Sequence, residues 1–341
     1  MVRPATVVAT GRYLPARRVD NDELRARFAG GDQADVIDRF EAASGIRQRY
    51  WADPAENTSD LAVAAAQQAL ERAGWAAADL DLILVGTDTP DRITPATSTI
   101  VQGKLGAHRA GTFDIGCACA SFPTALATAA GLIATNPSIR RVLVIGAYLM
   151  QRLADANDPM VFFYGDGAGA ALLAPADGPG LVASHFLADG RYADHWGIAA
   201  GGTEEPANPA ALAAGRTTVQ LYKRYPPTLN EQQWPAMIDA LARQAGFAPA
   251  AIRLAVFTQI NAESINTVCE QTGIPAERAP RLMDRYGYTG SACVPIALDH
   301  ALASGLTKSG ELVTLIGSGV GYNMAGVALY PEIIDQQGSR G

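Results

Sequence analysis

Short runs of apolar residues alternate along the chain with longer segments that have a helical pattern. The runs 80–86 and 141–146 are rich in Leu, Ile and Val without polar alternation, which is typical of strands buried on both faces. The segments 58–74 and 121–135 carry apolar and small residues at helical spacing, and Gly74 is a typical helix-ending residue. Strands that alternate with helices in this way predict an α/β protein.

The second half of the chain repeats the order of elements found in the first: helix, strand, helix, strand, glycine-rich turn, strand. The corresponding segments are 58–74 with 234–246, 78–85 with 251–257, 142–146 with 313–317, and 167–173 with 324–329. Such repetition favours two similar α/β halves packed together over a chance likeness between unrelated segments. We expect the first half to span 1–176 and the second to span 177–341.

Composition and charge exclude several classes of protein. Of the 341 residues, 48% are hydrophobic and 18% charged, which is the composition of a chain that forms a core. The net charge of −7 argues against a nucleic-acid partner, because phosphate binding needs a basic surface. The longest apolar stretch, 122–134, is interrupted by Pro, Thr and Gly and is too short to cross a membrane. The first residues lack a signal-peptide core and four cysteines make no disulfide framework, so a cytoplasmic location is expected.

Cys119 is the candidate nucleophile. It lies between an apolar segment, 111–115, and the helix expected from Ser121, so it should stand at a helix N-terminus. The partial positive charge there stabilises a thiolate and lowers the thiol pKa, which suits thioester exchange. Cys117 lies two residues back and should be turned away or buried. The alternative is that Cys119 is a small core residue, as most free cysteines are.

Several motifs in the right order resemble those of β-ketoacyl-acyl-carrier-protein synthase III, within the thiolase-like superfamily. Besides the string around Cys119, they are GRYLP at 11–15, SGIRQR at 44–49, FYGDGAGAA at 163–171 and GVGY at 319–322. The resemblance implies a five-layered α-β-α-β-α fold, usually in a homodimer. It also implies an acyl group carried on Cys119 and supplied by acyl-CoA or an acyl carrier protein, with no cofactor or metal.

Two side chains of the family's site are replaced in this chain. The family's H-Q-x-N motif reads TQIN at 258–261, so Thr258 stands at the His position. The family's H-G-N-T motif reads YGYT at 286–289, so Tyr288 stands at the Asn position. In the family these two side chains stabilise the thioester oxyanion and the enolate formed when a malonyl thioester loses carbon dioxide. Losing one such donor commonly costs about 10²–10³ in rate, so ordinary decarboxylative condensation should be weak or absent.

Backbone groups of the family's site do not depend on side-chain identity. The resemblance implies that the N–H groups of Cys119 and Val320 form an oxyanion hole. Around them, Gly319, Gly321 and Asn261 are expected to contact the substrate.

A further candidate lies in the segment 189–196, which resembles the family's D-G-S-Y segment at the wall of the substrate pocket. Trp196 is expected in that wall. His195 could reach the pocket and act as the missing base. The alternative is a wall histidine without a chemical role.

The donor-binding residues also depart from the family. Arg39 and Asp158 stand where the family holds the CoA adenine between a Trp and an Arg, and Glu263 replaces the Arg used to dock the carrier protein. Basic residues that could replace these contacts are Arg47, Arg49, Arg152, Lys223 and Arg224.

Together these residues predict an acyltransferase that passes an acyl group from a thioester through Cys119 to a hydroxyl, an amine or a carbon acid. Specialised-metabolite biosynthesis, of a polyketide or fatty-acid-like kind, is the expected setting. Two alternatives stay open. One is a decarboxylating 3-oxoacyl synthase in which Thr258, Tyr288 or water carries the oxyanion role. The other is a non-catalytic partner subunit of an active paralogue.

Overall fold

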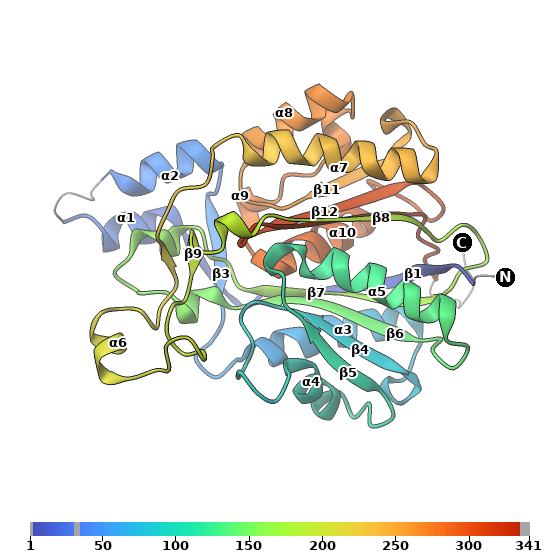
Figure 1. Ribbon diagram of the computed structural model, residues 1–341, viewed down its shortest axis with the longest axis horizontal. Coiled ribbons are helices and arrows are strands. Elements are labelled where there is room, and N and C mark those ends of the chain that lie inside the picture. The colour runs from blue at the N-terminus through green and yellow to red at the C-terminus, as the bar shows by residue number, and fades with distance from the viewer. Residues whose placement is uncertain (1–2, 31–34, 335–341) are drawn as a thin grey trace.

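The computed structural model describes residues 3–30 and 35–334, and two β-sheets form its framework (Figure 1). In spatial order, the first sheet contains β1 (Ala5–Tyr13), β7 (Gly167–Pro175), β6 (Val142–Tyr148), β4 (Leu82–Gly86) and β5 (Gly111–Ile115). The second contains β11 (Leu254–Phe257), β12 (Val313–Gly319), β13 (Asn323–Leu329) and β8 (Leu181–Ala188). The predicted strands are therefore present, with ends that shift by a few residues.

Helices cover both outer faces of the sheets and fill the space between them (Figure 1). The outer helices are α3 (Thr58–Ala73) and α4 (Thr97–Leu105) on the first sheet, and α7 (Leu229–Ala245) and α8 (Ala262–Thr272) on the second. The middle layer consists of α5 (Ser121–Thr135) and α10 (Cys293–Ala303), which contact strands of both sheets. This arrangement confirms the expected five-layered α-β-α-β-α fold.

Smaller elements complete the described part of the chain. They are β2 (Arg17–Asp20), α1 (Asn21–Arg27), α2 (Val36–Ser44), β3 (Gln48–Trp51), β9 (Trp196–Gly197), α6 (Pro209–Ala213), β10 (Gln220–Leu221) and α9 (Met283–Tyr286). Two of the pairs form small sheets of their own, β2 with β3 and β9 with β10.

The two halves of the chain share one strand topology. The order β1-β7-β6-β4 in the first sheet corresponds to β8-β13-β12-β11 in the second. In each sheet the last two strands of this order are parallel, and the other neighbours are antiparallel. The two similar halves inferred from the repeat are therefore present. The division at 176/177 lies between β7 and β8 and stays a prediction, because both halves contribute to one central helical layer.

Of the expected helices, one has its predicted ends and another begins earlier than predicted. Helix α5 has the predicted ends, whereas α7 begins at Leu229, five residues before the predicted start at Trp234. A start at Trp234 would have put Pro235 in the first turn, where Pro is favoured. Here it lies inside α7, where its ring nitrogen cannot donate to the preceding turn.

The central core forms where α5 lies between the sheets. Phe122, Leu126 and Ile133 of α5 are fully buried in a cluster that includes strand residues of both sheets, such as Val144 and Leu315. Burying each such side chain contributes about 1.5–3 kcal/mol. In the described part of the chain, 118–135 is long and apolar enough to cross a bilayer, but it is this buried core helix.

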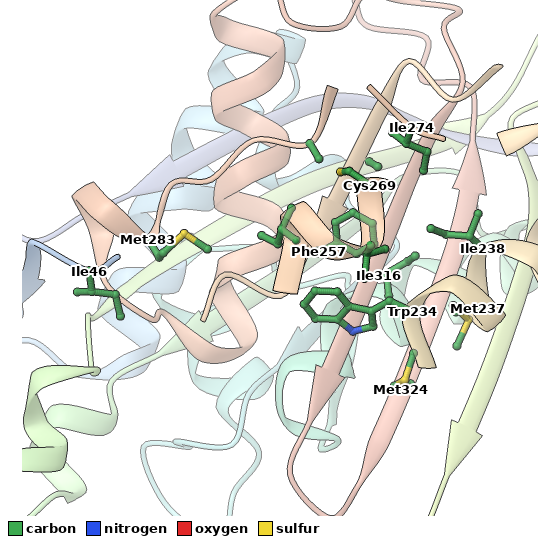
Figure 2. Close-up of a cluster of buried hydrophobic side chains, with 14 of the residues drawn as sticks. Ile46, Trp234, Met237, Ile238, Phe257, Cys269, Ile274, Met283, Ile316 and Met324 are labelled. Carbon is green, nitrogen blue, oxygen red and sulfur yellow. The ribbon is translucent and has the colours of Figure 1, made fainter. Parts of the chain in front are cut away.

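A second cluster lies between the second sheet and its outer helices (Figure 2). The rings of Trp234 and Phe257 stack with centroids 4.9 Å apart, next to Ile316. The indole N–H of Trp234 donates to the hydroxyl of Ser318 at 3.1 Å. Ser318 bonds to Thr258 in turn, so this core holds one wall of the candidate site in place.

Candidate active site

Cys119 lies where parallel strands of the first sheet end. Gly86 of β4 is in register with Ile115 of β5 and with Gly146 of β6. The chain beyond β5 leads to Cys119, and Tyr148 is the last residue of β6. The carboxyl ends of parallel strands are the usual place for the site of an α/β fold.

A strained turn holds Cys119 in front of α5. It lies in the 3₁₀ turn Ala118–Ala120, and Ala118 has a φ of 51°, in the left-handed region that side chains other than glycine rarely adopt. The thiol of Cys117 is 3.4 Å from the hydroxyl of Thr124, so it is directed along α5.

The second half of the chain brings Tyr288 onto this thiol. The hydroxyl oxygen of Tyr288 is 2.5 Å from the sulfur of Cys119, and Cys119 has no exposed surface. Burial raises the pKa of the Cys119 thiol well above its usual range, and the nearby Cys293 and Asp88 raise it further. The hydrogen bond from Tyr288 acts in the opposite direction and lowers it.

The raised pKa of Cys119 corrects the lowered value expected from its position at a helix start. The expectation rested on the partial charge of the helix N-terminus, which is worth about 0.3–1 kcal/mol at exposed sites. Complete removal of a thiolate from water costs more than this, and no cation is among the groups that shift the Cys119 pKa. Cys119 is therefore a neutral thiol at rest.

A cavity of about 370 Å³ lies against this pair. Its lining includes Tyr288, Thr258, Asn261, Gly319 and Val320, all of which the sequence predicted as site residues. Cys119 itself does not line the cavity and lies behind the hydroxyl of Tyr288. The structure therefore brings residues from both halves of the chain to one space.

Thr258 and Asn261 already have partners within the protein. The hydroxyl oxygen of Thr258 accepts the N–H of Ser318 at 2.8 Å, and its proton faces the carbonyl of Ser318 at 3.3 Å. The side-chain oxygen of Asn261 caps α8 by accepting the N–H of Glu263 at 2.9 Å. These bonds fix both side chains beside the cavity.

Gly319, the last residue of β12, lies against the backbone of Cys119. A Cβ atom on Gly319 would be 2.7 Å from the backbone nitrogen of Cys119, so only glycine allows this approach. Gly321 does not line the cavity. It has a φ of 116°, and its N–H donates to the hydroxyl of Tyr225 at 3.3 Å.

The structure places His195 and Trp196 outside the lining of this cavity. The ring of His195 packs 5.1 Å from that of Tyr225, a lining residue, and its Nδ1 is 3.1 Å from a carboxylate oxygen of Asp194. Trp196 lines a separate hollow and packs in a cluster with Tyr288. His195 therefore packs on Tyr225, which lines the cavity, and does not itself reach the cavity as expected.

The basic residues that were expected to contact a donor differ in their exposure and in their partners. Arg49 is fully buried, with its guanidinium donating to the carbonyl of Phe162 at 3.0 Å, so it cannot contact a donor, contrary to the expectation. Lys223 forms an ion pair with Asp194. Arg47, Arg152 and Arg224 remain exposed.

Sequence reasoning missed a polar group beside the nucleophile. Asp88 follows β4 by two residues, and its carboxylate is 3.4 Å from the hydroxyl of Ser291. Tyr148 is buried nearby, with its ring 5.7 Å from that of Tyr288. The sequence feature that could have identified Asp88 is its position directly after a buried strand. It lies at the sheet edge where β5, the strand before Cys119, also ends.

The sequence matches two family models, and the fold matches several solved structures. Residues 113–190 match the family described as 3-oxoacyl-acyl-carrier-protein (ACP) synthase III, and residues 242–330 match its C-terminal family. The solved structure of 3-oxoacyl-(acyl carrier protein) synthase III from Pseudomonas aeruginosa is 28% identical with a TM-score of 0.85, covering 96% of this chain and 98% of that one. The solved structure of β-ketoacyl-[acyl carrier protein] synthase III from Thermus thermophilus is 29% identical with a TM-score of 0.84, covering 95% of this chain and 98% of that one.

A third structure is the priming β-ketosynthase from the R1128 polyketide biosynthetic pathway. It is 30% identical with a TM-score of 0.85, and the match covers 97% of each chain. Fold and site thus define a transferase of the thiolase-like, condensing-enzyme class. Within that class the chain belongs to the 3-oxoacyl-acyl-carrier-protein synthase III family.

Proposed function

We propose that this chain is an acyltransferase that carries an acyl group on Cys119 and passes it to an acceptor without decarboxylative condensation. The observation that carries the proposal is the Tyr288 hydroxyl 2.5 Å from the Cys119 sulfur, beside a cavity of about 370 Å³. The nucleophile of the family is kept, and the family's His and Asn are not. The substrate we propose is an acyl-CoA or an acyl-carrier-protein thioester, used without a cofactor.

The first half of the proposed reaction acylates Cys119. Cys119 loses its thiol proton and attacks the carbonyl carbon of the donor thioester. A new carbon–sulfur bond to Cys119 forms, the donor's own carbon–sulfur bond breaks, and the leaving donor thiolate takes up the proton that Cys119 lost. The N–H of Cys119 belongs to the first turn of a helical segment, where N–H groups lack helical acceptors. Together with the N–H of Val320, it supplies an oxyanion hole. Tyr288 donates to the sulfur and so favours the thiolate.

The position of Thr258 supports transfer over condensation. An enolate oxygen formed by decarboxylation needs donors that point into the cavity. The single hydroxyl proton of Thr258 faces the carbonyl of Ser318, and its oxygen accepts the N–H of the same residue. Thr258 therefore offers no free donor at the position where the family has a His.

The second candidate function is a partner subunit that carries no acyl group. One observation favours it: Cys119 is completely buried and its thiol pKa is raised. In that case the cavity would shape or stabilise an active paralogue.

Intact-protein mass spectrometry separates these functions. The protein is incubated with acetyl-CoA, octanoyl-CoA and the corresponding acyl-carrier-protein thioesters, and the acylated peptide is mapped. We expect acylation of Cys119, its loss in Cys119→Ala and its retention in Cys117→Ala. Acylation that survives Cys119→Ala would contradict the proposed nucleophile, and no acylation with any donor would favour the partner subunit.

We further propose the cellular setting. A homodimer in the cytoplasm, acting in polyketide or fatty-acid-like biosynthesis of a specialised metabolite, agrees with the likeness to the R1128 priming ketosynthase and with the lost decarboxylation residues. Light scattering on the purified protein tests the dimer.

A further inference from the structure

Asp88 places a carboxyl group at the strand ends that hold the nucleophile. It follows β4, whose last residue Gly86 is in register with Ile115, the last residue of the strand before Cys119. Ser291, in the 3₁₀ turn just before α10, donates to the carbonyl of Ala147 at 2.6 Å and lies 3.4 Å from the Asp88 carboxylate. The Ser291 hydroxyl is therefore a long and weak donor to the carboxylate, which also accepts the backbone N–H of Asp88 itself.

Acidic groups surround Asp88, and within residues 3–30 and 35–334 no cation is among the groups that shift its pKa. The titratable groups that interact with its charge are Cys119, Tyr148, Tyr164 and Tyr288. In the described part of the chain, Asp88 forms no ion pair, and the buried hydroxyl of Tyr148 has no hydrogen-bond partner. A carboxylate without a counter-ion in such surroundings gains stability by accepting a proton.

The environment of Asp88 also suits proton uptake near neutral pH. Burial of the carboxyl group raises its pKa to about 6, while its own backbone N–H and Ser291 act in the opposite direction. The residue is nevertheless only half-buried, whereas Cys119 is completely closed off. Asp88 is therefore a partly accessible residue whose charge interacts with Cys119.

We propose that Asp88 is the proton acceptor for the second half of the reaction, in which an O–H or N–H acceptor takes the acyl group from Cys119. This rests on the proposed acyltransferase function. It gives Asp88 the role of the missing base, for which the sequence suggested His195.

The proposed step balances as follows. The oxygen or nitrogen of the acceptor forms a bond to the acyl carbon, and the carbon–sulfur bond to Cys119 breaks. The acceptor's proton goes to the carboxylate of Asp88. It then passes to the Cys119 thiolate, which restores the thiol and the carboxylate.

The test compares two nucleophiles on the isolated acyl-enzyme. Cys119 is acylated with octanoyl-CoA, excess donor is removed, and loss of the acyl group is followed by intact mass. Water must lose a proton as it attacks and so needs a base, whereas hydroxylamine attacks thioesters without one. We expect Asp88→Asn to slow hydrolysis by about 10²–10⁴-fold, the usual scale for a lost general base, and to leave hydroxylamine cleavage unchanged.

The pH profile distinguishes a base from a merely structural group. A carboxylate acts as a base above its pKa, so wild-type hydrolysis should rise through about pH 6 and the Asp88→Asn variant should lack that inflection. Ser291→Ala removes a bond that lowers the Asp88 pKa, so it should move the inflection upward. Asp91→Asn is the matched control, because this carboxylate of the same loop bonds to Ser59 at 2.6 Å.

The acylation rate separates a charge effect from a proton acceptor. The charge of Asp88 raises the Cys119 pKa, so Asp88→Asn should acylate at least as fast as wild type. Hydrolysis of its acyl-enzyme at the wild-type rate would overturn the proposal while leaving the acyltransferase intact, as would loss of hydrolysis in His195→Ala alone. If no donor acylates Cys119 in the wild-type protein, the proposed function fails and the role of Asp88 fails with it.

Discussion

The hydroxyl of Tyr288 lies 2.5 Å from the sulfur of Cys119, although 169 positions separate the two residues in the sequence. The contact joins the two halves of the chain at the candidate nucleophile. It puts a phenol beside the sulfur of Cys119, so this neighbouring group can donate one proton and is itself an acid. Burial and the neighbouring Cys119 raise the pKa of Tyr288 well above its usual range, which keeps it a donor at neutral pH.

Removing that donor should slow acylation of Cys119. Because the Tyr288 hydrogen bond lowers the thiol pKa, Tyr288→Phe raises it further and reduces the thiolate fraction at pH 7. Hydrogen bonds to charged groups are worth about 1.5–3 kcal/mol, so a loss of about 10–100-fold is expected. Single-turnover acylation followed by mass spectrometry measures it. Tyr286→Phe is the control, because Tyr286 ends α9 and its hydroxyl contacts His300 instead of Cys119. Equal acylation rates in the two variants would contradict the role of Tyr288.

Decarboxylation of malonyl thioesters should be far below the range of ordinary enzymes. Thr258 has no free donor, and turnover of about 1 s⁻¹ or more would contradict this expectation. Replacing both residues, Thr258→His with Tyr288→Asn, restores the family's donor types and should raise carbon dioxide release from malonyl-carrier protein. Either single variant serves as the control, because one restored donor leaves the pair incomplete.

Gly319→Ala should destabilise the protein and displace the nucleophile. The added Cβ would lie 2.7 Å from the backbone nitrogen of Cys119 and 2.6 Å from the Cβ of Ala118. Such overpacking typically costs about 1–3 kcal/mol, and acylation should fall together with stability. Gly103→Ala is the control, because its Cβ meets no atom within 4 Å. Urea unfolding and acylation rates that match wild type in Gly319→Ala would show that this turn can move.

The free energy of unfolding should depend on pH through the carboxyl group of Asp166. The carboxylate accepts the N–H of Ala52 at 2.9 Å, but burial raises its pKa to about 7, and its second oxygen has no partner. A pKa above the ordinary value of about 3.9 means that the folded state binds the proton more tightly than the unfolded state, so stability falls as pH rises from 4 to 7.

Comparison of wild type with Asp166→Asn tests this dependence by urea unfolding at pH 5 and pH 8. The wild type should lose stability relative to the variant by on the order of 1–4 kcal/mol between these values. Asp22→Asn, whose side chain is 87% exposed, should show no such change. A constant difference between wild type and Asp166→Asn would mean that the carboxyl is ionised at both values.

Local patterns in the sequence determined the elements, the two similar halves and the candidate nucleophile. Strand and helix periodicity depends on neighbouring residues, so α5 has its predicted ends and the strands of both halves are present. Motif order predicted Cys119 as the nucleophile, and the replacements at Thr258 and Tyr288, without any coordinates; these stay predictions. These features are readable because each lies within a short stretch of chain.

Only the tertiary structure decided what surrounds the nucleophile. The pKa of Cys119 depends on burial and on Asp88, Tyr288 and Cys293, which come from other strands and helices and outweigh the helix start. Likewise, Tyr225 separates His195 from the cavity. Desolvation and charge interactions act through space over a few ångströms, and neighbours at that range are set by sheet register and helix packing rather than by proximity in the sequence.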